Sequence, residues 1–272
     1  MPYRHAHWYL LSLFPLAGLA FWPSYVSQLR TAGAEFHAHG ITASLWIALL
    51  AFQSWTIHRG RRETHRSAGM LSLALFPLFL AGGVSIFIGM AKRFEAGTSP
   101  FHLMYAPRLA WLDVVAVIGM AAFYYLALKH RRKVHVHSRY LLATALFLMP
   151  PILSRLSPFI PPLSPSGPAD FYKIGYGVHI ANSITIATAL LLALRAPKHG
   201  RPWFAGAALV AASMVLFETV GRWPAWQALF VHAAGLPVLP VILAAAAAGA
   251  AIAWAGWTAG RRTQPMGAAQ PA

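Results

Sequence analysis

Long apolar stretches alternate with short polar segments along almost the whole chain. Each stretch holds roughly 18–24 residues, enough for an α-helix to cross a hydrocarbon core of about 30 Å. They fall at about residues 8–26, 38–57, 68–91, 109–128, 140–160, 172–194, 203–220 and 236–258. The pattern predicts an all-α, polytopic transmembrane helix bundle of about eight spans.

The domain organisation follows from the same pattern. We expect a single transmembrane bundle over residues 1–262 and a disordered cytoplasmic tail over 263–272. The first apolar stretch has no small-x-small cleavage site after it, so we expect it to be a retained span and not a signal peptide.

The basic residues assign an orientation to the bundle. If the N-terminus lies inside, the inner segments hold 15 of the 22 Lys and Arg residues. These segments are 1–7, 58–66, 129–139, 195–201 and 259–272. The positive-inside rule therefore predicts that both termini are cytoplasmic, in a multi-pass protein of the cell membrane (the bacterial inner membrane).

The composition supports a lipid bilayer as the surrounding medium. The chain is 58% hydrophobic and 10% charged, whereas a soluble domain is usually about 25% charged. The net charge of +16 comes from short loops that form no continuous stripe, so we expect no nucleic-acid partner. The absence of cysteine excludes disulfides, thiolate metal sites and iron–sulfur clusters, so any metal or haem must use the 13 histidines.

Three outer segments differ from the inner loops. Residues 92–107 and 158–170 are long enough to fold over the membrane face. Residues 223–235 contain Trp223 and Trp226 and suggest a short interfacial helix.

Asp113 and Arg155 are ionisable side chains expected inside the outer half of the bundle. Each lies about five residues from the outer end of its span, roughly 7–8 Å deep. An ion pair between them would offset much of the desolvation cost. Alternatively, Arg155 extends outward and Asp113 forms local hydrogen bonds. Pro150 and Pro151 bend the same span, as a cavity wall or as an ordinary kink.

Histidines accumulate at the same depth. His37 and His39 open the second span, and His179 lies on a polar stripe of the sixth. With Asp113 and Arg155 as catalytic or positioning groups, these histidines predict a metal, haem or polar-substrate site that opens outward. The alternative is a hydrogen-bonded packing cluster.

A second set of histidines lies near the inner face. His65 opens the third span and His137 the fifth. Among so many Lys and Arg residues they are either solvated side chains, contacts for lipid head groups, or the inner half of an electron path.

The pattern of His-x-His-Gly with Trp46 and Gln53, then His65-Arg66-x-x-Gly, then His137-x-Arg resembles a group of uncharacterised bacterial multi-pass membrane proteins. This resemblance covers about residues 36–156 and implies a shared membrane fold. The chain is more loosely similar to the ascorbate-reducible b-type cytochromes. That likeness implies an outer haem at His39 with a partner such as His179, and an inner haem b at His65 and His137.

We therefore expect a membrane-bound oxidoreductase that uses haem b or a histidine-bound transition metal and acts on a hydrophobic small molecule or a quinone. The alternatives are a small-molecule transporter, with the Pro150–Pro151 helix as its moving element, and a non-catalytic assembly protein. The motifs of common soluble enzymes are missing from the sequence.

Overall fold

The computed structural model describes residues 3–261, which form helices and turns with no strand. The expected tail, 263–272, lies outside this range. The helices are α1 (Ala6–Ala20), α2 (Ala34–His58), α3 (Arg62–Ala96), α4 (Pro100–Lys129), α5 (Val134–Ala143), α6 (Met149–Leu156), α7 (Tyr172–Leu194), α8 (Arg201–Glu218), α9 (Pro224–His232) and α10 (Val238–Ala259). The predicted all-α bundle is confirmed.

Seven segments are long and apolar enough to cross a membrane. They are α2, α3, α4, the continuous segment from α5 to α6, α7, α8 and α10. The first predicted span is shorter than expected, because α1 ends at Ala20 after 15 residues. Pro23 disfavours helix at the residue before it, and the chain turns there, with the Val26 amide donating to the Phe21 carbonyl.

The segment 92–107, expected to be an outer loop, is almost entirely helical. Only residues 97–99 separate α3 from α4. Gly97 adopts a left-handed conformation (φ 65°) that ends α3. The Ser99 side chain then accepts from the His102 amide, and Pro100 begins α4, a favourable first helical residue. The outer segment 158–170 remains irregular, as expected, and the expected short helix is α9.

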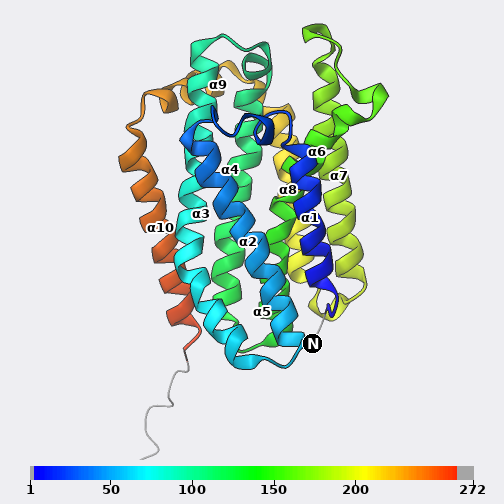
Figure 1. The fold of residues 1–272 in the computed structure, drawn as a ribbon, viewed down its shortest axis with the longest axis vertical. Coiled ribbons are helices and arrows are strands. Elements are labelled where there is room, and N and C mark those ends of the chain that lie inside the picture. The colour runs from blue at the N-terminus through cyan, green and yellow to red at the C-terminus, as the bar shows by residue number, and fades with distance from the viewer. Residues whose placement is uncertain (1–2, 262–272) are drawn as a thin grey trace, which may run out of the picture.

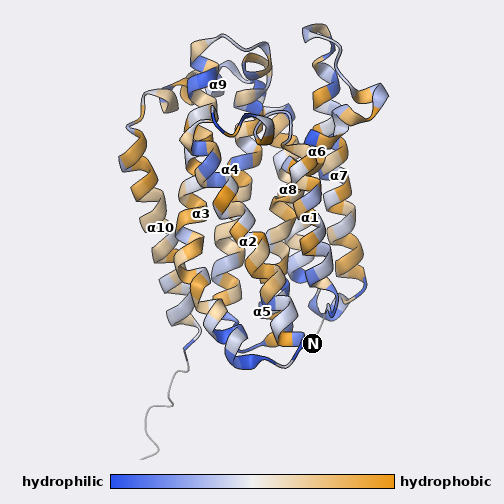
Figure 2. Cartoon of the chain, in the orientation of Figure 1, coloured by the Kyte–Doolittle hydropathy of each residue, from blue (hydrophilic) through white to orange (hydrophobic). Residues whose placement is uncertain are grey.

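Both ends of the described chain lie at the same end of the bundle. In Figure 1 the start of α1, the α2–α3 turn, the α7–α8 connection and the end of α10 all lie at the bottom. Figure 2 shows hydrophilic residues at both ends of the bundle and mostly apolar residues along the helices between them. We call the end at the bottom of Figure 1 the basic end, because the basic connections of the sequence lie there, and the opposite one the outer end. The positive-inside rule predicts that the basic end faces the cytoplasm.

The helices close into a ring. Neighbours pack in the order α1, α2, α3, α4, α8, α7, α6 and back to α1, and α10 packs outside on α3 and α4. Helix α5 packs on α4 and α8, whereas α6 packs on α1 and α7. The span formed by α5 and α6, which we call the broken span, therefore runs from the middle of the bundle at the basic end to the perimeter of the bundle at the outer end. In the outer half of the ring, α2, α4 and α6 do not pack directly against one another.

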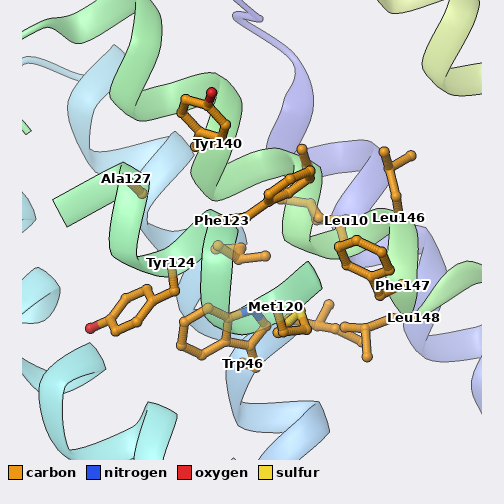
Figure 3. Packing of buried hydrophobic residues seen from close by; sticks show 14 of the residues in the cluster. Leu10, Trp46, Met120, Phe123, Tyr124, Ala127, Tyr140, Leu146, Phe147 and Leu148 are labelled. Atoms are coloured by element: carbon orange, nitrogen blue, oxygen red, sulfur yellow. The ribbon is translucent and has the colours of Figure 1, made fainter. Parts of the chain in front are cut away.

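The hydrophobic core lies where the broken span crosses the ring. Trp46 is fully buried and its indole Nε1 donates to Thr144 Oγ1 at 3.1 Å. Figure 3 shows Trp46 with Tyr124 on one side and Met120, Leu148 and Phe147 on the other. The helical ladder breaks in the 3-10 turn η2 (Thr144–Phe147), before the prolines that predicted the bend. Pro150 and Pro151 sit instead in the first turn of α6, where a missing N–H costs least.

Candidate functional site

Three polar residues face the outer half of the ring from three helices. His39 lies in the second turn of α2, Asp113 near the middle of α4 and Arg155 in the last turn of α6. The charge of Arg155 acts on both Asp113 and His39. We call these three residues the polar cluster.

Arg155 does not form the expected direct ion pair. Its Nη1 donates to the Pro151 carbonyl at 2.9 Å, and its guanidinium carbon lies 4.6 Å from the centre of the Phe21 ring. Among residues 3–261, no ion pair joins Arg155 to Asp113 or to another acid. The two groups therefore interact through space, and the guanidinium keeps free N–H donors.

The surroundings of Arg155 indicate an accessible hollow within the bundle. Dense protein surrounds both Arg155 and Asp113, yet the side chain of Arg155 is exposed and that of Asp113 is half-buried. A side chain that is surrounded by protein and still accessible is typical of a recess between helices. Helices α2, α4 and α6 do not pack directly against one another.

His39 provides a third polar group in the same region. Its Nδ1 is buried and has no hydrogen-bond partner. The ring stacks on Phe79, with centroids 5.7 Å apart and planes at 15°, and Phe79 stacks in turn on Trp46 at 5.9 Å and 9°. This stack fixes the plane of the His39 imidazole. The direction in which its unpartnered Nδ1 points is therefore fixed as well.

The three histidines expected to bind a metal are not brought together. His37 shares a hydrogen bond of 2.9 Å with the Tyr25 hydroxyl, and His179 bonds to Glu218 at 2.8 Å. Helix α2 is continuous from Ala34, so residues two apart point about 200° apart and His37 diverges from His39. Within residues 3–261, no group of three or more His, Asp or Glu side chains could hold a metal ion.

A charge network centred on Glu218 occupies the neighbouring part of the outer end. Glu218 accepts from Arg108 at 2.7 Å and from His179 at 2.8 Å, and it also pairs with Arg222. Arg108 packs against Phe217, with its guanidinium carbon 4.1 Å from the ring centre. This network ties α4, α7 and α8 together. The sequence placed Glu218 and His179 near this rim. It did not identify Arg108 as part of a site, because the span was expected to start at residue 109, just after Arg108.

The inner histidines, His65 and His137, lie close enough for one to act on the other. The Nδ1 of His137 is 2.8 Å from the Ala127 carbonyl oxygen, and that of His65 is 3.2 Å from the main-chain oxygen of Gln53. The Gln53 side-chain amide donates back to the His65 carbonyl at 3.0 Å. If each Nδ1 carries the proton, both Nε2 lone pairs remain free, as in histidines that ligate metals.

Three further histidines of the basic end, His130, His135 and His199, have ordinary solvated surroundings. His135 and His199 are exposed and stack with centroids 5.0 Å apart. Burial, and then the charges of Lys133 and Lys129, lower the pKa of His130, which lies in the α4–α5 connection. These side chains fit the solvated interpretation of the basic loops.

The sequence and the structure were also compared with known proteins. No protein-family model matches the chain, and no curated protein and no solved structure matches it. The function therefore has to be argued from the geometry of the polar cluster and of the inner histidines.

Proposed function

We propose that this protein binds a quinone, or a lipophilic molecule with a quinone-like head, in the outer half of its bundle and exchanges electrons with it in the bacterial inner membrane. The observation that carries the proposal is Arg155, an accessible guanidinium with no acidic partner, held between apolar helices beside His39 and Asp113. A ligand that partitions into the bilayer can reach such a position.

The chemistry of the polar cluster suits a quinone head group. A quinone presents two carbonyl oxygens that accept hydrogen bonds, and both the Arg155 guanidinium and the His39 imidazole can donate to them. Reduction to a quinol consumes two electrons and two protons. Asp113, within the electrostatic reach of Arg155, is positioned to pass protons to the reduced oxygen. The aromatic ring of Phe21, beside Arg155, provides an apolar surface for the ring or its tail.

The inner pair supports haem b as the electron carrier. His65 and His137 come from α3 and α5, and each has its Nδ1 at hydrogen-bonding distance from a main-chain carbonyl. His65 and His137 would hold the haem iron through their Nε2 atoms, and the haem would supply one-electron transfer. The main-chain oxygen of Gln53 orients the His65 ring, and the Gln53 side-chain amide donates to the His65 carbonyl. An absorption spectrum of the purified protein tests this part: a Soret band that disappears in His137→Ala supports it, and a colourless protein contradicts it.

Quinone binding is tested with a short-chain quinone and protein in detergent. Quenching of tryptophan fluorescence reports binding, because Trp46 is stacked on Phe79 next to His39. We expect Arg155→Ala to weaken binding about 10–100-fold, the loss of a charge-assisted hydrogen bond. Arg30→Ala removes an exposed arginine outside the helices and should leave binding unchanged. Equal binding by wild type and Arg155→Ala contradicts the proposal.

A transporter is the second candidate, and the break in the α5–α6 span favours it. Interrupted helices line the substrate sites of many transporters, and Arg155 lies just beyond this break. Uptake into proteoliposomes that is abolished by Arg155→Ala, in a protein that binds no haem, would support transport over electron transfer.

A further inference from the structure

Three polar atoms at the basic end of α1 and α2 are buried and have no hydrogen-bond partner among residues 3–261. They are His7 Nδ1, Ser54 Oγ and His58 Nε2. They belong neither to the polar cluster nor to the inner pair. Buried polar atoms are almost always satisfied by protein, water or an ion, so this group calls for a ligand.

The packing of α1 against α2 brings the two histidines together. The helices run antiparallel through the turn at residues 21–33 and pack along their length. His7 lies in the first turn of α1 and His58 is the last residue of α2, and the two are close enough for one to act on the other. No hydrogen bond joins the two rings, and each keeps a buried nitrogen without a partner among the described residues.

The tautomer of His58 is suited to ligation. Its Nδ1 lies 2.7 Å from the Ser54 carbonyl oxygen, which can only accept, so the proton sits on Nδ1. The Nε2 is therefore a lone pair, held in orientation by the main chain. This arrangement, one ring nitrogen on a carbonyl and the other free, is the one that metal-binding histidines use.

We propose that His7 and His58 bind one d-block metal ion, with Ser54 Oγ or water completing its coordination. Metal–imidazole bonds of about 2.0–2.1 Å let one ion bridge two nitrogens that are too far apart to bond to each other. The two nitrogens are imidazole nitrogens and no carboxylate among residues 3–261 joins them, a ligand set that disfavours hard cations. Copper and zinc bind imidazole strongly, copper(II) most of all, so copper(II) is the expected ion. The proposal does not depend on the function proposed above.

The test uses the full-length protein without a polyhistidine tag, stripped with a chelator and titrated with copper(II). Electron paramagnetic resonance should show one tight site with nitrogen hyperfine coupling. We expect His7→Gln and His58→Gln each to lower the affinity of that site at least tenfold. His135→Gln, which removes an exposed histidine at the same end, should leave it unchanged.

Two results would overturn the proposal. One is a wild-type protein with no tight copper site, which would mean that a buried water alone satisfies these atoms. The other is copper binding by the His7 and His58 variants that equals wild type. If a variant fails to fold, X-ray absorption of the copper-loaded wild type decides: two imidazole ligands at about 2.0 Å support the site, and fewer than two contradict it.

Discussion

At the scale of single residues, Glu218 is the charge on which the outer end most depends. It is the acidic partner of Arg108, whose side chain is only 10% exposed. Replacing it in Glu218→Gln leaves that guanidinium without its counter-charge. We expect the free energy of unfolding in detergent to fall by about 1–3 kcal/mol, measured by thermal or denaturant unfolding.

A matched control is Asp170→Asn. Asp170, in the outer segment 158–170, pairs with Lys173 three residues away in the first turn of α7. This local pair does not join two helices, and local surface pairs contribute little. Its effect should be clearly smaller than that of Glu218→Gln. Equal effects of the two substitutions would mean that the Glu218 network does not hold the helices together.

The sequence could predict that Asp113 and Arg155 lie in the same part of the bundle, but not how they interact. Depth follows from counting residues along a helix at about 1.5 Å each. Whether two side chains meet depends on helix rotation and spacing, and the 3-10 turn η2 changes both for α6. Arg155 therefore lies near Asp113 without pairing with it. His179, which the sequence grouped with His37 and His39, likewise bonds to Glu218 instead.

At the scale of helices, the close contact between α4 and the 3-10 turn η2 offers a direct test of the packing. A Cβ added at Gly119 would overlap the ring of Phe147. We expect Gly119→Ala to destabilise the protein by about 1–3 kcal/mol, because a packed core cannot easily accept an added methyl group. Thermal unfolding in detergent measures the effect.

Gly18→Ala is the control for this prediction. A Cβ at Gly18, in α1, meets nothing within 4 Å, so alanine should be neutral or stabilise the helix by up to about 1 kcal/mol. If Gly119→Ala behaved like Gly18→Ala, the broken span would not pack against α4 as described.

The existence of the helices could be predicted from the length of the apolar stretches, and α7 follows its predicted bounds, 172–194. The ends of the other helices could not be predicted as well. The polar residues at 92–95 suggested a loop, yet Arg93 pairs with Glu35 at 2.7 Å and so belongs to the end of α3. A tertiary ion pair of this kind has no local signature. The break at Thr144–Phe147 was also displaced from the prolines, because Thr144 bonds to Trp46 from another helix.

At the scale of the whole molecule, the orientation can be tested directly because the chain contains no cysteine. Single cysteines introduced at Arg61, Arg132 or Lys198, all at the basic end, should react with a membrane-impermeant thiol reagent only after the cells are opened. Cysteines at Thr98 or Ser166 should react in intact cells. The reverse pattern would contradict the orientation, and mixed labelling at the basic end would contradict a single topology.

The central claim is that the hollow between α2, α4 and α6 holds a quinone head. The most direct measurement is photoaffinity labelling of the membrane-embedded protein with a photoreactive quinone, followed by mass spectrometry of the labelled peptides. The account predicts modification around His39, Asp113 and Arg155, blocked by excess unlabelled quinone. Labelling that is confined to the outward-facing surfaces of the bundle, or that excess quinone does not reduce, would contradict it.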